Sequence, residues 1–302
     1  MIVAAFPGQG SQTPGFLTPW LDLEGVTERL ALASDAAEVD LIAAGTEWDA
    51  DRIRDTRVAQ PLIVAASLVS YEALRARAAA PTDVAGHSVG ELAALVAAGV
   101  IDFADAMRIV GVRGRAMADA AAVVATGMSA VIGGVEDQVL QAIADAGLEP
   151  ANYNGAGQIV AAGEKAGLDA LAANAPRGSR VIPLQVAGAF HTSFMAPAVD
   201  ALQAAVDQTS PVSDPALTLW SNSDGKPVTE GARALELIVH QVRNPVRWDL
   251  CMASFADAGI DGLIELAPAG ALTGLAKRGL KGTPTVAVKT PDDLDSAAAL
   301  LA

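Results

Sequence analysis

The residue with the clearest chemical potential is Ser88, which lies inside the pentapeptide GHSVG. The segment fits the pattern G-x-S-x-G, between an apolar run at Asp83–Gly86 and the helical pattern ELAALVAAG. Glycines on both sides let a strand and a helix approach closely around a strained turn that exposes the serine hydroxyl. The backbone N–H of Val89 would then face a developing oxyanion at the start of the helix. We therefore expect a nucleophile elbow, with an ordinary polar turn as the alternative.

A serine nucleophile needs a base at neutral pH, and the chain has three histidines. His87 adjoins Ser88, so its side chain should diverge from the hydroxyl and brace the turn. His240 lies on the polar side of a predicted helix, where we expect a solvated surface residue. His191 follows the apolar run VIPLQV at the expected start of a helix, a place that favours the neutral imidazole of a general base. His191 is thus the predicted base, and a structural histidine is the alternative.

The loop FPGQGSQ follows the first apolar run and resembles half of a dinucleotide-binding fingerprint. Thr13 stands where the third glycine of that fingerprint belongs, so the loop is a poor nucleotide signal. A glycine loop after the first strand can instead supply a second oxyanion N–H, here from Gln9. A plain strand-to-helix turn is the other interpretation.

Arg113 is the most informative charged residue. The helix around ADAMRIVGVRGRAMADA carries one apolar stripe at i, i+3 and i+4 spacing: Ala106, Ile109, Val110, Ala116, Met117 and Ala120. Arg113 falls on that stripe, whereas Arg108 and Arg115 lie off it, near Asp105 and Asp119 respectively, where we expect a solvated, charge-paired face. An arginine turned inward is costly unless an anion meets it. That anion is either a distant carboxylate of the chain or the carboxylate of a substrate.

The elements that must position these residues alternate between strand and helix. Apolar runs at Ile2–Phe6, Asp83–Gly86 and Gly262–Leu266 are each followed by a turn and a helical pattern, which favours a parallel sheet covered by helices. Between residues 126 and 187 the pattern changes to βαββαβ, the split ferredoxin-like order. Its expected elements are Met128–Ile132, Glu136–Ala146, Pro150–Tyr153, Gln158–Ala162, Lys165–Ala175 and Val181–Val186.

The composition excludes several classes of protein. With 302 residues, 52% apolar and 18% charged, the chain can bury a large core. A net charge of −15 disfavours non-specific nucleic-acid binding and binding to anionic membranes. Cys251 is the only cysteine, and the segment MIVAAFPGQG has no basic region typical of a signal peptide. The uncharged run from Ala120 to Val135 has 16 residues, is interrupted by glycines and is too short for a membrane span, so we expect a soluble, cytoplasmic protein.

Seven segments, taken in order and spacing, resemble the malonyl-CoA:acyl carrier protein transacylases of bacterial fatty-acid synthesis: FPGQGSQ, GHSVGELAAL, RGRAM, NYNGAGQIVAAG, GAFHTSFM, QVRNPVRW and ELAPAGALTGLAKR. The resemblance spans nearly the whole chain. It implies an α/β fold, with an α/β-hydrolase-like large domain at residues 1–125 and 188–302 that contains a parallel sheet. It also implies an inserted ferredoxin-like subdomain at residues 126–187.

The resemblance implies a role for each matching residue. Ser88 would be the acylated nucleophile and His191 its base, with the backbone N–H groups of Gln9 and Val89 as oxyanion donors. Arg113 would bind the malonyl carboxylate. No metal or redox cofactor is needed for this chemistry.

Three further residues match the family near the acyl site. Gln241 would orient His191 through its main-chain carbonyl, which accounts for the absence of a recognisable acid between serine and histidine. Asn154 matches a position near the acyl group, although an asparagine in a turn is its alternative. Phe190, in the segment GAFH, would narrow the pocket against an α-methyl group.

The implied reaction is ping-pong transfer of a malonyl group from malonyl-CoA to the phosphopantetheine thiol of acyl carrier protein. The alternatives are a free-standing acyltransferase serving a polyketide synthase, a serine esterase or thioesterase, and a non-catalytic acyl-CoA-binding or carrier-binding module. Carrier proteins of this pathway are generally acidic, so an acidic enzyme would need a local basic patch. Lys277, Arg278 and Lys281 are the candidate patch, with a solvated basic helix end as the alternative.

Overall fold

The computed structural model describes all residues from 1 to 302 and contains two β-sheets. The larger sheet has the strand order β11-β10-β1-β2-β7-β8, in which every neighbouring pair is parallel except β7 and β8. Its strands are β1 (Ile2–Phe6), β2 (Asp83–Gly86), β7 (Thr218–Trp220), β8 (Pro227–Val228), β10 (Gly262–Glu265) and β11 (Thr285–Ala287).

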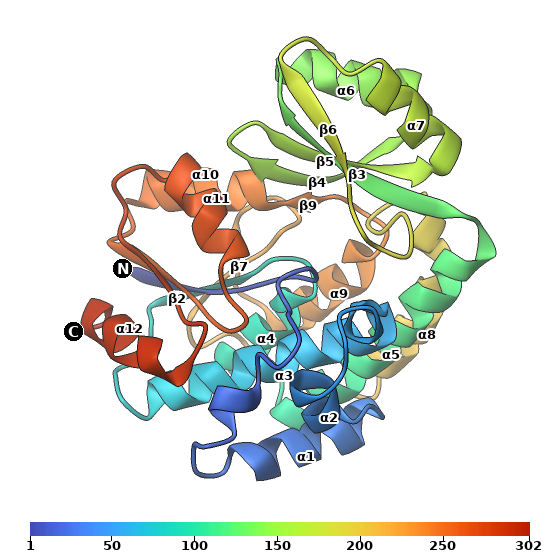
Figure 1. Cartoon of the computed structure of the whole chain (residues 1–302). Coiled ribbons are helices and arrows are strands. Elements are labelled where there is room, and N and C mark those ends of the chain that lie inside the picture. Colours follow the sequence, from blue (N-terminus) through green and yellow to red (C-terminus); the bar gives the residue numbers. More distant parts are fainter.

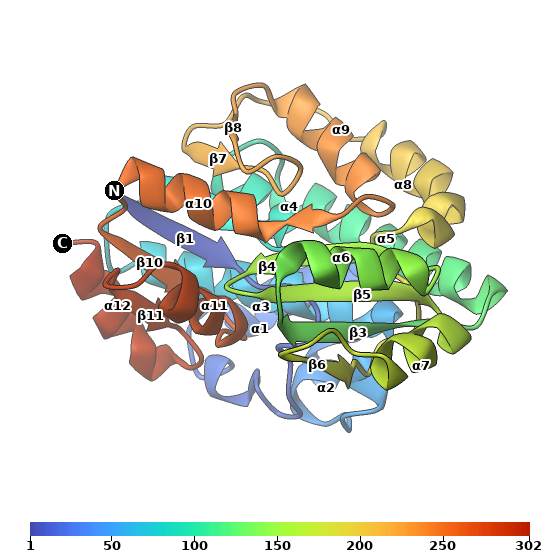
Figure 2. The ribbon, with the colours of Figure 1, turned by 90° about the horizontal axis from the view of Figure 1, so that it is seen from above.

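Helices cover both faces of this sheet (Figures 1 and 2). The helices of the larger unit are α1 (Val26–Ala37), α2 (Leu41–Thr46), α3 (Thr56–Arg75), α4 (Gly90–Ala97), α5 (Phe103–Val123), α8 (Val199–Val206), α9 (Gly231–Gln241), α10 (Trp248–Ala258), α11 (Ala271–Gly279) and α12 (Leu294–Leu300). Side chains alternate along each strand, so Ala4 and Phe6 pack in the core with α3, α4 and α5. Val3 and Ala5 point the other way, into the core formed with α10 and α11.

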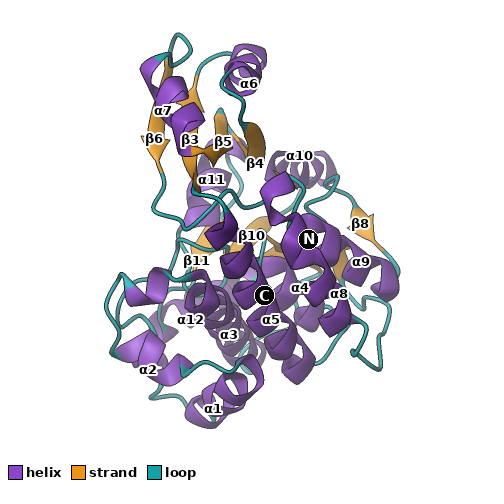
Figure 3. Cartoon of the chain, turned by 90° about the vertical axis from the view of Figure 1, so that its right-hand side faces the viewer, coloured by secondary structure: helices purple, strands orange, loops and turns teal.

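The smaller sheet stands above the larger unit in Figure 1 and projects from it in Figure 3. Its strand order is β6-β3-β5-β4-β9, with β3 (Thr126–Gly133), β4 (Glu149–Gly155), β5 (Gln158–Glu164), β6 (Ser179–Pro183) and β9 (Val246–Arg247). Helices α6 (Glu136–Asp145) and α7 (Lys165–Ala173) cover one face around Val131 and Ile159. The opposite face, with Ala130 and Val160, joins the main core and faces the larger unit.

The expected elements all form, with differences at their ends. The last strand of the βαββαβ segment covers Ser179–Pro183, earlier than expected, and a strand from outside the segment, β9, adds to its sheet. Strands β7, β8, β9 and β11 were not predicted, because runs of two or three residues are too short to show a period. No helix combines the length and the apolar character needed to cross a bilayer.

Both arginines of the charge-paired face predicted on α5 form ion pairs, but one of the expected partners is different. Arg108 pairs with Asp105 at 2.6 Å, as expected. The pairing predicted for Arg115 with Asp119 is wrong. Arg115 instead donates to the Ala37 carbonyl at 2.9 Å and pairs with Glu38, because it lies against the C-terminal end of α1, where cations are favoured.

Candidate active site

Ser88 occupies a tight turn between β2 and α4. Its φ of 53° is in the left-handed region, which non-glycine residues rarely adopt. A Cβ on Gly86 would lie 2.1 Å from the backbone nitrogen of Glu91, and a Cβ on Gly90 would lie 2.1 Å from the oxygen of Phe6. Only glycines therefore fit on either side of the serine. The turn has the geometry that the sequence predicted for an elbow.

The side chain of His191 lies against this serine. Its Nε2 is 2.7 Å from Ser88 Oγ, and its Nδ1 is 2.9 Å from the main-chain oxygen of Gln241. A carbonyl only accepts, so Nδ1 carries the proton and Nε2 presents a lone pair to the serine hydroxyl. The Ser88 hydroxyl can thus give its proton to the ring. His191 also has a positive φ, of 62°, and the element that follows it is a 3₁₀ segment, Ser193–Ala198, capped by Thr192, rather than an α-helix.

Electrostatics keep His191 neutral. Its side chain is buried, and desolvation, followed by the nearby charge of Arg113, lowers its pKa to about 3. The imidazole is therefore unprotonated at neutral pH, and its Nε2 lone pair is free to accept the Ser88 proton. The other two histidines behave as predicted: His240 is exposed, and His87 points away from the serine to contact Asn154 at 2.9 Å.

Arg113 is almost completely buried on α5, with 1% of its surface exposed. Nη1 donates to Gln60 Oε1 at 2.7 Å, and Nη2 donates to Gln241 Oε1 at 3.0 Å and lies 3.4 Å from Ser88 Oγ. Its Nε has no partner. Burial lowers its pKa to about 10, so the guanidinium remains charged at neutral pH. The predicted inward arginine is present, and no carboxylate contacts it directly.

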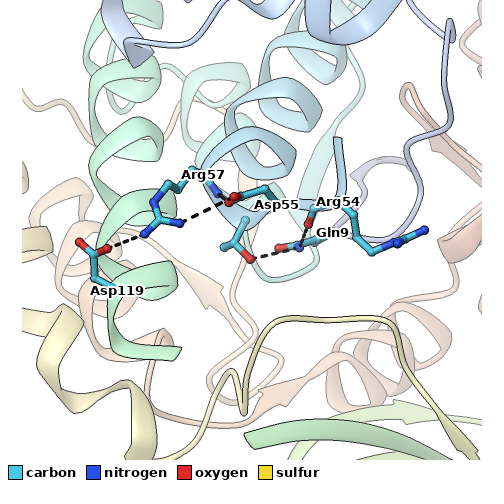
Figure 4. A network of polar contacts seen from close by, with 6 residues as sticks. Gln9, Arg54, Asp55, Arg57 and Asp119 are labelled. Carbon is cyan, nitrogen blue, oxygen red and sulfur yellow. Dashed lines mark hydrogen bonds and ion pairs between the residues drawn. The ribbon is translucent and has the colours of Figure 1, made fainter. Parts of the chain in front are cut away.

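The loop after β1 is held in place by the start of α3, as Figure 4 shows. The side chain of Gln9 donates to the oxygen of Arg54 at 3.3 Å and to Thr56 at 3.4 Å. The start of α3 is in turn fixed by Asp55, which caps it by accepting the Arg57 N–H. Arg57 also pairs with Asp119 on α5 at 2.6 Å. The loop is thus held against the start of α3, and α3 is held against α5.

The backbone N–H groups of Gln9 and Val89 have no hydrogen-bond acceptor within the protein. Both residues line the pocket that contains Ser88 and His191. The chain after Phe6 continues as an irregular loop and not as a plain strand-to-helix turn. Two free N–H donors beside a serine are what an oxyanion hole requires.

This pocket lies between the larger unit and the smaller sheet. Its other lining residues are Gln60, His87, Met117, Met128, Asn152, Asn154, Gln158, Val160, Leu184, Val186 and Phe190. Asn154 belongs to β4 and reaches across to His87, next to the serine, so it is not an asparagine of a turn. Phe190 is buried in the wall. The pocket thus contains the serine–histidine pair and an apolar wall with a few amide groups.

The predicted basic patch lies at the end of α11 and in the turn after it. Lys277, Arg278 and Lys281 are all exposed. Arg278 donates to Gln158 at 3.2 Å, and Gln158 is one of the residues lining the pocket. The patch therefore lies beside the entrance to the site.

Sequence reasoning missed three residues that contact the site. Asn222 accepts the N–H of Ser88 at 2.8 Å, Glu91 binds both Asn222 and Gln241, and Gln60 binds Arg113. Glu91 and Gln60 each stand at the start of a strongly apolar helical run, ELAALV and QPLIVAASLV, which is the signal that could have revealed them. Asn222 lies in the segment WSNSDG, which looks like an ordinary turn.

The chain is similar to known proteins over its full length. The family described as "Acyl transferase domain" matches residues 3–296. A curated relative from Mycobacterium tuberculosis, named malonyl CoA-acyl carrier protein transacylase, is 50% identical over 99% of this chain and 100% of its own length.

Two solved structures extend the similarity to the fold. A crystal structure of MCAT from Mycobacterium tuberculosis has a TM-score of 0.95 and 50% identity, covering 99% of each chain. A malonyl-transacylase in complex with its type II PKS acyl-carrier protein has a TM-score of 0.90 and 32% identity, again over 99% of each chain. The serine-histidine pair, the inward arginine and these matches agree, and the chain belongs to the acyl transferase domain family.

Proposed function

We propose that this acyltransferase moves a malonyl group from malonyl-CoA to the phosphopantetheine thiol of an acyl carrier protein, supplying extender units for fatty-acid synthesis. The observation that carries the proposal is Arg113, a buried cation next to Ser88 Oγ whose partners are neutral amide oxygens. Such a cation fits an acyl group that carries its own carboxylate. The names of the full-length relatives support the same substrate.

In the first half-reaction, Ser88 Oγ attacks the carbonyl carbon of the malonyl thioester while its proton passes to His191 Nε2. The N–H groups of Gln9 and Val89 donate to the oxyanion of the tetrahedral intermediate. The carbon–sulfur bond then breaks, and the coenzyme A thiolate leaves with the proton from His191. The product is a malonyl ester of Ser88.

In the second half-reaction, the carrier's thiol gives its proton to His191 and its sulfur attacks the malonyl ester. The Ser88 alkoxide leaves and recovers the proton from His191. Gln241 has the same role in both halves, because its main-chain oxygen holds the Nδ1–H of His191. No step of this scheme requires a metal or a redox cofactor.

The malonyl carboxylate has an electrostatic effect on the base. In the free enzyme the charge of Arg113 is one of the causes that lower the pKa of His191. A carboxylate bound at Arg113 offsets that charge and makes the imidazole a stronger base. A charged acyl group therefore favours its own transfer, and a neutral acyl group does not.

The carrier protein would dock at the basic patch of Lys277, Arg278 and Lys281. The patch is exposed and next to the pocket, and Arg278 contacts Gln158 in the pocket wall. An acidic carrier bound there would hold its prosthetic arm close to Ser88. The solved complex between a related transacylase and a type II PKS acyl-carrier protein supports a carrier as partner. It also keeps a polyketide carrier as the second candidate acceptor.

A serine esterase fits this site less well. An esterase has no use for a buried cation beside its nucleophile, and Arg113 is costly to bury without an anion.

We also interpret residues 1–125 and 188–302 as an α/β-hydrolase-like domain and residues 126–187 as a ferredoxin-like subdomain. The parallel sheet with its elbow supports the first interpretation, and the order βαββαβ supports the second.

The function is tested by incubating the protein with malonyl-CoA, methylmalonyl-CoA and acetyl-CoA, followed by intact mass and peptide mapping. We expect a malonyl adduct on the peptide that contains Ser88, and less adduct from methylmalonyl-CoA because Phe190 narrows the pocket. In a parallel colorimetric assay, simple esters should turn over slowly. Rapid ester hydrolysis without an adduct would indicate an esterase, and the absence of both would indicate a binding module.

A further inference from the structure

Glu91 has a buried carboxylate at the centre of the site, and the mechanism above does not use it. The residue follows the second glycine of the elbow, at the start of α4, and is 5% exposed. Its Oε1 accepts the backbone N–H of Asn222 at 2.6 Å, and its Oε2 accepts an Nε2–H of Gln241 at 2.5 Å. Burying a carboxylate is costly unless its charge is paired or used.

One of the two hydrogen bonds of Glu91 connects it to Arg113 through the Gln241 side chain. A carboxylate only accepts hydrogen bonds, so Gln241 must turn its NH₂ group toward Glu91. The amide oxygen of Gln241 then points the other way and accepts from Arg113 Nη2 at 3.0 Å. With the amide reversed, two donors would face each other at Arg113. Glu91 therefore determines which end of the Gln241 amide meets the guanidinium.

The other hydrogen bond of Glu91 connects it to the elbow at Ser88 through Asn222. Asn222, whose N–H binds Glu91, accepts the Ser88 N–H with its Oδ1 at 2.8 Å. Its Nδ2 donates to the oxygen of Gly86 at 2.7 Å, at the end of β2. A single carboxylate thus fixes the guanidinium and the nucleophile relative to each other.

We propose that Glu91 is a positioning residue that orients the Arg113 guanidinium, through the Gln241 amide, toward the carboxylate of the acyl group. Glu91 thereby sets the preference for a charged over a neutral acyl thioester, without contact to the substrate. The inference rests on the proposed malonyl transfer. Its measurable quantity is the ratio of kcat/KM for malonyl-CoA to kcat/KM for acetyl-CoA.

The direct test is Glu91→Gln, which has nearly the same shape but presents an NH₂ group on one side. We expect the malonyl-to-acetyl ratio to fall about tenfold, the size typical of coupled residues in one hydrogen-bond network. The matched control is Glu265→Gln. Glu265 is also buried and accepts backbone N–H groups at the start of α11, and it has no hydrogen bond to Gln241, Asn222 or Ser88. The control should lower the melting temperature and leave the ratio unchanged.

A double-mutant cycle separates positioning from general damage. If Glu91 acts through Arg113, then Glu91→Gln should not change the ratio further in an Arg113→Ala background. Equal losses for both thioesters in the single variant, or the same drop in the Arg113→Ala background, would overturn the inference. If Arg113→Ala itself leaves the ratio unchanged, the proposed function fails. If Arg113→Ala lowers the ratio and Glu91→Gln does not, only the role of Glu91 fails.

A second measurement needs no change in Glu91. Burial raises the pKa of Glu91 to about 7, and the protonated acid presents an O–H donor much as glutamine presents an NH₂ group. The ratio for the wild-type protein should therefore fall between about pH 8 and about pH 6. A flat ratio across this range would contradict the inference even if the variant fails to fold.

Other groups near Glu91 must be excluded as the source of that change. They are Arg113 on α5, His240 on α9, Arg247 on β9 and Cys251 on α10. The two arginines stay charged and burial keeps the thiol of Cys251 protonated, since its pKa is raised. His240 is an exposed histidine close to Gln241, so His240→Gln is the control. The control should keep the pH dependence, and its loss in this variant would assign the effect to His240 and overturn the role of Glu91.

Discussion

Replacing Arg113 by alanine should remove the selection of a charged acyl group. In the free enzyme the guanidinium binds two neutral oxygens, from Gln60 at 2.7 Å and Gln241 at 3.0 Å, and a malonyl carboxylate would add the missing negative charge. Truncating one partner of such a buried pair costs about 2–5 kcal/mol. At about 1.4 kcal/mol per factor of ten, kcat/KM for malonyl-CoA should fall about 30- to 4,000-fold.

Acetyl-CoA has no carboxylate, so its kcat/KM should be unchanged or higher. An increase is expected because the charge of Arg113 contributes to the low pKa of His191, and its removal makes the base stronger. The variant Arg113→Lys keeps the charge but loses the planar fork, and should fall between wild type and Arg113→Ala for malonyl-CoA. The assay is kcat/KM for both thioesters, with circular dichroism to confirm folding. An equal loss for both thioesters would refute the reasoning and show that Arg113 only supports the fold.

The variant His191→Asn suits the left-handed backbone at that residue and should slow acyl transfer by about 10²- to 10⁴-fold. Because burial lowers the pKa of His191 to about 3, the unfolded chain binds a proton below pH 6.5 that the folded protein does not. The wild type should therefore lose about 1.4 kcal/mol of unfolding free energy per pH unit as the pH falls from about 6 to about 4, relative to the variant. If the unfolding free energy, measured by chemical denaturation, changes with pH equally in the wild type and in His191→Asn, this prediction is contradicted. Gly90→Ala should prevent folding, because its Cβ would lie 2.1 Å from a backbone oxygen of the first strand, whereas Gly274→Ala has open space around it. Equal melting temperatures for Gly90→Ala and Gly274→Ala would contradict the close contact described between the elbow and the first strand. Finally, reversing Lys277 and Arg278 to glutamate should slow transfer to the carrier and spare acylation by malonyl-CoA. Equal effects on both steps would remove the patch from the docking site.

The reactive part of the site could be predicted because its signals are local. The elbow at Ser88 needs only two glycines between a strand and a helix, and Arg113 was visible from the 3.6-residue period of one helix. His191 followed from elimination among three histidines. The serine and arginine signals depend on residues near one another in the sequence, and the elimination needs only the count of histidines, so none of them requires knowledge of the fold.

Of the residues that orient this site, Gln241 was expected only from the family resemblance, and Asn222 and Glu91 were not predicted. Asn222 meets Ser88 across 134 positions, and Gln241 meets Glu91 across 150. These contacts exist only once the sheet is assembled, and no local pattern encodes them. The same limit applies to β9, a strand of two residues whose place in the smaller sheet depends on pairing with β4.

The central claim is that Ser88 carries the malonyl group between the two substrates, and a chase experiment on the isolated acyl-enzyme tests it most directly. The protein is loaded with malonyl-CoA, freed of coenzyme A, and mixed with holo acyl carrier protein. Intact mass should then show one malonyl group leaving the Ser88 peptide and appearing on the carrier, and Ser88→Ala should acquire no malonyl group. A malonyl adduct on the alanine variant, or an adduct on wild type that passes to water and not to the carrier, would contradict this account.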